Sequence, residues 1–443
     1  MCLKTVSCGC LMLLCASAGA GIPLLKVAVM SDVQGMPYAE DAGMRNLERA
    51  LDVFAGLKPD VIVNAGDIND CGNDVDAVRY YKARCDVRLG KLPHVACLGN
   101  HEIDFVRKEN RGRRTRDVCL AEFNAVFGDG PSAVVHRVLG GYDFISLAVA
   151  STERYAAEDV AALKVALDAA VAHDAKKPVF VVTHFHPLDT VNSSGSAKQD
   201  SGLRALFNGY PQVVNLSGHT HNPLQDPRSI WQGEFTVIDT STLCYGCIAM
   251  KPQAANQVSC LIPYGHEAVG CLFIEVYADR MVARRFSVRN RQEIEPDRPW
   301  TFALPYDPKH PTYSFAARAS KESVPDFGGD AEPTLWYDYG YVYLMFGAVC
   351  PSRSVFGYRV ELSEEGGETK SYFHLSDYYR LPAYRQDRVV FRMPPHAVRA
   401  DGRYRCRVFP VGFFGGEGAP LVWSFGIRSG YPCRADRPNV LPE

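Results

Sequence analysis

The chain has 443 residues, of which 47% are hydrophobic and 22% are charged, with 37 glycines and 28 prolines. This composition is typical of a folded globular protein of two or three domains, and it excludes collagen-like and disordered chains. Because 48 basic residues stand against 50 acidic ones, the formal net charge is -2, and no overall charge attracts the chain to nucleic acid or to an anionic membrane.

Residues 1–20 predict a secretory signal peptide. Lys4 is the only charged residue near the N-terminus, residues 6–15 are largely apolar, and Ala18-Gly19-Ala20 has the small-x-small pattern that signal peptidase cleaves. The apolar run ends after about 15 residues, which is shorter than the ~20 needed to cross a bilayer. A lipid anchor at Cys15 is less favoured because bulky residues precede it. We therefore expect a secreted or periplasmic protein with no transmembrane segment in the mature chain.

Residues 21–290 alternate between strand-like and helix-like patterns. Leu24–Met30 predicts a buried strand, and the apolar residues of the next segment recur at steps of three and four, from Met44 to Phe54, which predicts a helix. Further strands are predicted at residues 61–63, 94–98, 179–182 and 213–216, and a further helix at residues 156–171. Such alternation predicts an α/β domain.

Polar motifs follow five of these predicted strands. They are Asp32-Val33-Gln34, Gly66-Asp67, Gly99-Asn100-His101-Glu102, Thr183-His184-Phe185-His186 and Gly218-His219-Thr220-His221. Loops beyond the carboxyl ends of strands in an α/β sheet line a common crevice, so we expect the motifs to converge on one rim. Their carboxylates, amides and imidazoles suit Mn, Fe or Zn, and Asp67 on its tight Gly-Asp turn could reach two cations. The motifs therefore predict a site for two divalent metal ions.

In this order the motifs resemble those of the calcineurin-like metallophosphoesterases, which carry Asp-x-His, Gly-Asp, Gly-Asn-His-Asp/Glu, His and Gly-His-x-His. The resemblance covers about residues 25–290 and implies a four-layer αββα sandwich of two stacked mixed sheets. It also implies that His101 is the proton donor or charge stabiliser beside the metals. The implied ligands are Asp32, Gln34, Asp67 and His221 for one metal and Asp67, Asn100, His184 and His219 for the other.

Gln34 departs from the family pattern, because most members carry a histidine there. A glutamine carbonyl oxygen is a weaker and neutral ligand, so the first metal would bind less tightly or be a harder ion such as Mn. The Asp-x-Gln version is similar to the manganese-dependent ADP-ribose and CDP-alcohol diphosphatases of the same superfamily. This similarity is a hint toward phosphoric anhydride or diester substrates.

The resemblance implies a metal-dependent phosphoesterase. In this interpretation a metal-bridging hydroxide attacks the phosphorus of a small phosphorylated substrate, while the cations neutralise the charge that builds on its oxygens. The substrate would be a phosphomonoester, a phosphodiester or a nucleotide diphosphate, and no nucleic acid is specifically implied. The alternative is a secreted adhesion or scaffold protein whose metal site is degenerate because of Gln34.

Two further features are candidates for substrate binding. His186 would face the same way as His184 if the strand continued through Phe185, and it could then contact the substrate phosphate. We favour His184 over His186 as the metal ligand. Residues 107–116 hold six basic residues in ten, so they are either a solvated charged loop or a flap that gathers anions through Arg111, Arg113 and Arg114.

The C-terminal part of the chain has a different pattern. Residues 291–333 have weak periodicity and predict a linker or packed strap, whereas residues 334–443 contain short strands separated by turns and predict a small all-β sandwich. Tyr404, two residues before Cys406, has the arrangement of a tyrosine corner, and the module resembles a fibronectin type III or immunoglobulin-like domain. The fibronectin-like version is favoured because no tryptophan follows Cys350 in the next strand, and a Cys350–Cys406 bond is left open. This domain is a candidate for cell-surface or glycan contact.

Overall fold

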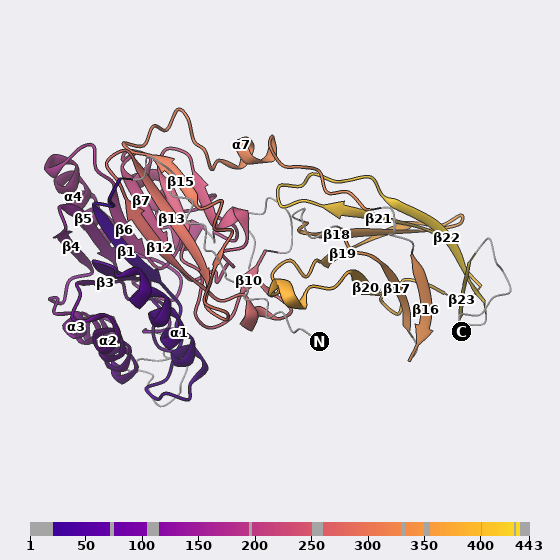
Figure 1. Ribbon diagram of the computed structural model, residues 1–443, viewed down its shortest axis with the longest axis horizontal. Helices are drawn as coiled ribbons and strands as arrows, with labels where there is room; N and C mark the ends of the chain where they lie inside the picture. Colours follow the sequence, from indigo (N-terminus) through magenta and orange to yellow (C-terminus); the bar gives the residue numbers. More distant parts are fainter. Residues whose placement is uncertain are drawn as a thin grey trace, which may run out of the picture.

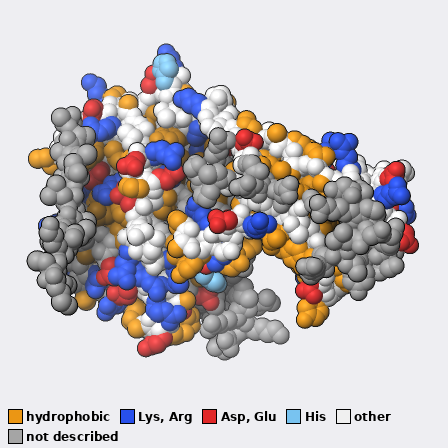
Figure 2. Space-filling view, turned by 45° about the vertical axis from the view of Figure 1, so that its right-hand side comes forward, with side chains coloured by type: hydrophobic (Ala, Val, Ile, Leu, Met, Phe, Trp, Pro, Cys, Tyr) orange, Lys and Arg blue, Asp and Glu red, His pale blue; other side chains and the backbone are white. Residues whose placement is uncertain are grey.

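The computed structural model describes residues 21–70, 75–103, 115–194, 197–249, 260–328, 333–339, 341–349, 355–399, 401–428 and 431–434. The predicted signal peptide, the three arginines of the predicted flap and Cys350 lie outside these residues. An α/β domain forms one end of the elongated molecule and a β-sandwich forms the other (Figure 1). Basic and acidic side chains are interspersed on the face drawn in Figure 2. No helix within the described ranges has the length and apolar character that a bilayer crossing requires.

Seven strands form the first sheet of the α/β domain, in the order β14-β13-β12-β1-β2-β3 with β15 beside β13. Their bounds are β1 (Leu25–Met30), β2 (Val61–Asn64), β3 (His94–Ala96), β12 (Gly270–Val276), β13 (Arg280–Ser287), β14 (Gln292–Ile294) and β15 (Trp300–Ala303). Strands β1, β2 and β3 are parallel, whereas β12 runs antiparallel to β1. The outer face packs against α1 (Ala42–Leu57), α2 (Val75–Leu89) and α3 (Arg116–Phe127).

Six strands form the second sheet, in the order β4-β5-β6-β7-β9-β8. Their bounds are β4 (Val134–Leu139), β5 (Tyr142–Leu147), β6 (Val179–Thr183), β7 (Val213–Ser217), β8 (Ile230–Gln232) and β9 (Thr236–Asp239). The outer face of this sheet packs against α4 (Ala157–His173), and the short helices α5 (Ala197–Asp200) and α6 (Leu203–Phe207) connect β6 to β7. Strands β5, β6, β7 and β9 are parallel, so their carboxyl ends lie at one edge.

The two sheets pack face to face, with alternate residues of each strand serving different layers. In β1, Val27 and Val29 lie in the layer between the sheets together with Phe144 of β5, whereas Ala28 and Met30 face the helices. Because both faces of such a strand are buried, its sequence is almost continuously apolar. The four-layer αββα sandwich that the resemblance implies is confirmed.

Part of the segment predicted as a linker or packed strap extends the first sheet. Strands β14 and β15 both pair with β13, and α7 (Phe315–Ala319) then leads toward the second domain (Figure 1). In β15, alternation places Trp300 and Phe302 in the layer between the sheets. Strands of three and four residues are too short to give a clear period in the sequence, which is why they were not predicted.

The C-terminal domain consists of a three-stranded sheet β16-β17-β20 and a five-stranded sheet β19-β18-β21-β22-β23. The strands are β16 (Thr334–Asp338), β17 (Tyr341–Gly347), β18 (Gly357–Glu364), β19 (Thr369–Leu375), β20 (Arg388–Arg392), β21 (Arg403–Val411), β22 (Leu421–Arg428) and β23 (Tyr431–Arg434). The sheets enclose a separate hydrophobic core, so the expected all-β domain is confirmed. The backbone N–H of Arg399 donates to Tyr404 Oη over 2.8 Å, which is the hydrogen bond of a tyrosine corner. Cys406 is a buried free thiol.

The two domains meet through a buried cluster that lies beside the short hairpin β10 (Cys247–Ile248) and β11 (Cys260–Leu261). Its members are Ile248, Ile262 and Ala268 from the first domain and Phe356, Tyr379, Phe413 and Phe414 from the second. Arg228 of the first domain is fully buried, and its guanidinium carbon lies 4.4 Å from the centroid of the Phe356 ring. A cation over an aromatic face is attracted to it, so this contact adds to the apolar packing.

Candidate metal centre

The predicted motifs lie in loops at the carboxyl ends of five strands. Asp32 follows β1, Asp67 follows β2 and Asn100 follows β3, while His184 follows β6 and His219 follows β7. The loops are bonded to one another through their backbones: Asp32 N–H donates to the Gly66 carbonyl over 3.0 Å, and Gly218 N–H donates to the His184 carbonyl over 3.1 Å. His219 N–H donates to Asp32 Oδ2 over 3.0 Å, so loops of both sheets contribute to one rim, as the placement of the motifs predicted.

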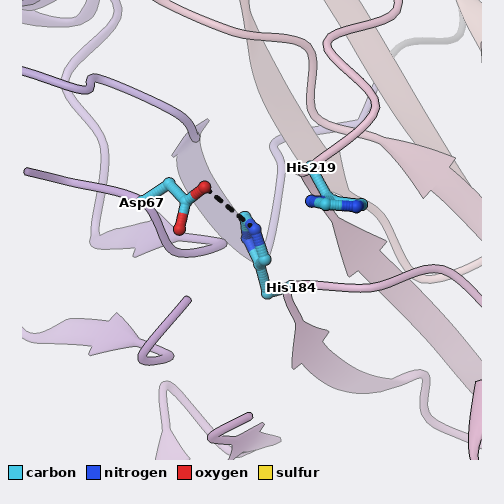
Figure 3. A group of neighbouring side chains, drawn as sticks. All are labelled: Asp67, His184 and His219. Atoms are coloured by element: carbon cyan, nitrogen blue, oxygen red, sulfur yellow. Dashed lines mark ion pairs between the residues drawn. The ribbon is translucent and has the colours of Figure 1, made fainter. Parts of the chain in front are cut away.

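Asp67 lies at the centre of one group of candidate ligands. Its Oδ2 is 3.1 Å from His184 Nε2, and Figure 3 shows the His184 ring between the Asp67 carboxylate and the His219 ring. One ligand atom from each of these three residues lies within 4.8 Å of the others. Asn100 Oδ1 is 2.9 Å from His184 Nε2. The four predicted ligands of one metal thus lie together, with His184 in contact with Asp67 and Asn100.

Asp32 lies at the centre of the other group. Its Oδ1 is 3.1 Å from His221 Nε2. The Gln34 amide nitrogen lies 3.4 Å from His221 Nε2 and 3.2 Å from His101 Nε2. Rotation of the amide by half a turn would present its carbonyl oxygen to the same place. Gln34 is therefore next to His221, which is a candidate ligand of the same metal.

Two of the imidazoles are held in one orientation by backbone carbonyls. His184 Nδ1 donates to the Ala65 carbonyl over 2.8 Å, and His221 Nδ1 donates to the Tyr245 carbonyl over 2.9 Å. A proton on Nδ1 leaves Nε2 as the atom that can bind a metal, and such partners are typical of metal-ligating histidines. In both residues Nε2 is the atom that faces a carboxylate.

The backbone is strained at most of the candidate ligands. Five of the seven have a positive φ, namely 48° at Asp32, 45° at Gln34, 52° at Asp67, 71° at His219 and 56° at His221. Residues other than glycine rarely adopt this conformation, which costs of the order of 1–3 kcal/mol each and is concentrated at functional sites. The positive φ angles bend the backbone sharply and turn these side chains toward the rim. If the strands continued, the side chains would point in other directions.

The motif glycines leave space for the carboxylates. A Cβ atom on Gly99 would lie 2.2 Å from Asp67 Oδ1, and one on Gly218 would lie 2.4 Å from Asp32 Oδ2. Both separations are far shorter than any van der Waals contact. A side chain at either position would therefore displace a candidate ligand.

Glu102 has a role that the sequence analysis did not assign. Its buried carboxylate accepts backbone N–H groups of Asp67, Ile68, Asn69 and Gly99, over 3.1, 2.7, 3.2 and 2.7 Å. It therefore ties the Gly-Asp loop to the Gly-Asn-His loop. Burial and the nearby charge of Asp67 raise the pKa of Glu102 to about 7. In the sequence, the position of Glu102 at the end of the Gly99-Asn100-His101-Glu102 motif was the signal that could have indicated this role.

A cationic imidazole balances the two buried carboxylates. Burial opposes a charged His184 ring, but Asp67 and Asp32 outweigh burial and raise the pKa of His184 to about 9. Burial also opposes a charged Asp67, but His184 and His101 outweigh it and hold the pKa of that carboxyl below its usual value. Burial and the charge of His184 lower the pKa of His219 to about 3, so His219 is neutral and can donate its lone pair. The donor set fits divalent cations, which can replace the His184 proton.

Gln199 contacts the same site without having been predicted. Its Nε2 lies 2.8 Å from His219 Nε2. The His219 ring is held from another side by Phe185, whose ring centroid is 4.7 Å away. Gln199 lies in α5, apart from every motif, so no pattern in the sequence indicated it.

The prediction that His186 contacts the substrate phosphate disagrees with its surroundings. His186 is buried, with Nε2 at 2.8 Å from Thr220 Oγ1 and 3.1 Å from Asp239 Oδ2. Its other ring nitrogen contacts Ser217 Oγ. The reason is that β6 ends at Thr183, so the alternation assumed for residues 184 and 186 does not continue. His186 belongs to a buried polar network beneath the rim.

Residues 25–223 match the model of the calcineurin-like phosphoesterase family. The match spans less than half of the chain but includes β1 to β7 and all five motifs. This part of the chain is therefore similar to the calcineurin-like phosphoesterase family. A search of curated proteins finds no match to the sequence.

Several solved structures have a similar arrangement at low sequence identity. A dimetal phosphatase from Danio rerio is 12% identical, with 64% of this chain and 100% of that chain covered and a TM-score of 0.44. A purple acid phosphatase from seeds of yellow lupin (Lupinus luteus) is 12% identical, with 63% of this chain and 53% of that chain covered and a TM-score of 0.45. GAP50, the anchor in the inner membrane complex of Plasmodium, is 16% identical, with 64% and 89% covered and a TM-score of 0.40. At these TM-scores the similarities assign no activity to this chain.

Proposed function

Because residues 25–223 match the calcineurin-like phosphoesterase family, we propose that this protein is a two-metal phosphohydrolase that acts on small phosphorylated molecules. The observation that carries the proposal is that donors from five separate loops meet at one rim, within contact of one another. One metal would be held by Asp32, Gln34, Asp67 and His221, and the other by Asp67, Asn100, His184 and His219.

When bound, two divalent cations lower the pKa of a coordinated water toward neutrality and offset the charge that builds on phosphoryl oxygens. The residues of this chain orient the candidate metal ligands. Glu102 holds the Asp67 carboxylate in place through the backbone of its loop. The Ala65 and Tyr245 carbonyls keep the protons of His184 and His221 on Nδ1.

His101 is the group best placed to donate a proton to the leaving oxygen. Its Nδ1 is hydrogen-bonded to the Asp70 carbonyl, and its Nε2 lies 3.8 Å from Asp67 Oδ2 at the open side of the site. Burial lowers the pKa of His101, but Asp67 and the Asp70 carbonyl outweigh burial and raise it above the usual value. A raised pKa favours the protonated form of this imidazole, which is the form that a general acid requires.

Gln34 narrows the choice of metal within this proposal. Its amide oxygen is neutral and hard, so we expect Mn to support activity better than Zn at equal occupancy. Phosphomonoesters, phosphodiesters and nucleotide diphosphates all present the nonbridging oxygens that such a site binds. The secreted or periplasmic location predicted from residues 1–20 is part of the proposal.

The test is a metal analysis combined with a substrate panel. The purified full-length protein is loaded separately with Mn, Fe and Zn, its metal content is measured, and hydrolysis of a chromogenic monoester, a chromogenic diester and a nucleotide diphosphate is followed. We expect about two equivalents of metal and turnover of at least one class. Protein that binds no metal and hydrolyses none of the three would contradict the proposal and favour the adhesion or scaffold alternative.

A further inference from the structure

Thr220 separates two candidate ligands whose backbones are both strained. His219 has a φ of 71° and His221 a φ of 56°. Thr220 itself is buried, and its Oγ1 donates to Asp239 Oδ2 over 2.6 Å. Asp239 is the last residue of β9, on a rigid strand of the second sheet. The loop of residues 218–222 is therefore fastened at its middle residue to the sheet beneath it.

Asp239 collects several hydrogen bonds in a region that excludes water. Its Oδ2 accepts from Asn222 Nδ2 over 2.9 Å and lies 3.1 Å from His186 Nε2, and its Oδ1 accepts from Ser241 N–H over 2.7 Å. Asp239, Asn222 and His186 are each at most 1% exposed. Because the Thr220 hydroxyl donates to Asp239, it accepts from His186 Nε2, which fixes the tautomer of that ring.

The same network continues toward the C-terminal domain. Asn222 Nδ2 also donates to the Asn192 carbonyl, and Asn192 N–H donates to the Arg228 carbonyl over 3.1 Å. The Arg228 guanidinium pairs with Asp226 in a two-pronged contact of 2.9 and 2.7 Å. Asp226 Oδ2 then accepts the hydroxyl of Tyr379, a residue of the C-terminal domain, over 2.8 Å.

We propose that this buried network, which runs from Tyr379 through Asp226, Arg228, Asn192, Asn222 and Asp239 to Thr220, positions His219 and His221 for metal binding. The inference rests on the proposed metal site. It gives the C-terminal domain a role, because Tyr379 supports the far end of the network. Thr220, Asp239 and Tyr379 are positioning residues, since they act on the metal only through the two histidines.

The physical reason is the cost of the loop conformation. Left-handed backbone at His219 and His221 opposes the native loop conformation, so the loop needs an anchor that offsets this cost. The hydrogen bond from Thr220 to the buried Asp239 carboxylate stabilises the loop, and removing one partner leaves the other unsatisfied. Without the Thr220 hydroxyl, the loop can relax and the two imidazoles separate from the carboxylates.

The first experiment removes the anchor at Thr220. In the full-length protein, Thr220→Val keeps the volume and removes the hydroxyl, whereas Thr220→Ser keeps the hydroxyl. Mn²⁺ affinity is measured by titration calorimetry on protein stripped of metal, with circular dichroism to verify folding. We expect Thr220→Val to weaken Mn²⁺ binding about 10- to 100-fold and Thr220→Ser to stay within about threefold.

A matched control shows whether any buried threonine would do the same. Thr236 is fully buried in β9, and its Oγ1 accepts from Gln232 Nε2 over 3.1 Å, away from the 218–222 loop. Thr236→Val should leave Mn²⁺ affinity unchanged. Equal Mn²⁺ affinity in folded Thr220→Val and wild-type protein overturns the inference while the proposed function stands. A wild-type protein that binds no Mn²⁺, Fe²⁺ or Zn²⁺ overturns both.

The second experiment tests the contribution of the C-terminal domain. Tyr379→Phe removes the hydroxyl that Asp226 accepts, and Tyr378→Phe is its control because the Tyr378 hydroxyl donates to the Gln225 carbonyl over 3.2 Å, outside the network. We expect Tyr379→Phe to weaken Mn²⁺ binding about two- to fivefold. Its effect should be smaller when Thr220→Val has already broken the network, because residues of one network are not additive. An unchanged affinity in Tyr379→Phe removes the C-terminal domain from the inference.

Discussion

The α/β domain has buried residues other than glycine with positive φ angles, whereas the described part of the C-terminal domain has such angles only at exposed residues. In the C-terminal domain the described residues other than glycine with positive φ are Tyr339 and Asp401, and both are exposed in turns. In the α/β domain, Asp32, Gln34 and Asp67 combine positive φ with burial and with contacts to ionisable groups. A positive φ angle in a surface turn only reverses the direction of the chain. A positive φ angle at a buried carboxylate costs conformational energy that the surrounding structure must offset. Among the described residues, the combination of positive φ and buried charge therefore coincides with the candidate metal centre.

The strongest test of this comparison removes the Asp67 carboxylate, which both metals would share. Asp67→Asn removes the charge that both metals would need, so we expect hydrolysis to fall by more than about a thousandfold in a phosphoesterase assay with Mn²⁺. Asp60→Asn is the control, because Asp60 lies at the opposite end of β2 and its carboxylate accepts only from Lys26 N–H in the contacts described. Full activity in Asp67→Asn would mean that the rim is not the active site.

The next test removes the carboxylate that ties two loops together. Glu102→Gln keeps the shape but turns one acceptor oxygen into a donor that faces backbone N–H groups. We expect a loss of about 2–4 kcal/mol in the free energy of unfolding, measured with urea, and a clear fall in activity. Glu158→Gln, at an exposed position in the first turn of α4, should change neither. Wild-type stability in Glu102→Gln would show that the four hydrogen bonds contribute little.

The charge balance of the site predicts a pH dependence. Because the pKa of His184 is raised to about 9, this ring must lose a proton before its Nε2 can bind a metal at neutral pH. Metal affinity should therefore fall by up to about tenfold for each unit that the pH drops below 9. Titration calorimetry at pH 6, 7 and 8 in buffers of different ionisation enthalpy would measure both the affinity and the proton released. Affinity independent of pH would contradict a protonated His184.

The smallest effect is expected in the C-terminal core. Tyr404→Phe removes the acceptor of the Arg399 N–H, so it should lower the free energy of unfolding by about 1 kcal/mol without changing metal affinity. Tyr372→Phe is the control, because the Tyr372 hydroxyl is buried with no hydrogen-bond partner in the described structure. If Tyr404→Phe weakened Mn²⁺ binding as strongly as Thr220→Val, the contrast between the domains would fail.

The sequence predicted those features that follow from short-range patterns. Strands such as β1 and β6 are apolar on both faces and are followed by polar motifs. Both features made these strands predictable from the sequence. Strands β14 and β15 were missed because three or four residues of mixed polarity carry no period. The convergence of the ligands was predictable because parallel strands place their carboxyl ends together.

The parts of the site that were missed depend on contacts between distant residues. Gln199 contacts His219 from α5 and Asp239 contacts Thr220 from β9, and neither stands in a motif. For His186 the expected orientation depended on the strand continuing through Phe185, and a strand that ends at Thr183 no longer dictates which way later side chains point. Orientation beyond the end of a strand depends on packing, which a single sequence does not contain.

Arg228 has a consequence for how this protein can be divided. Its charge is sealed between Asp226 and the aromatic rings of Phe356 and Phe413, which lie in the other half of the chain. A fragment cut back to the α/β half would expose an ion pair and an apolar surface that normally never meet water, and we expect it to aggregate. The two halves should therefore be expressed and engineered together as a single unit.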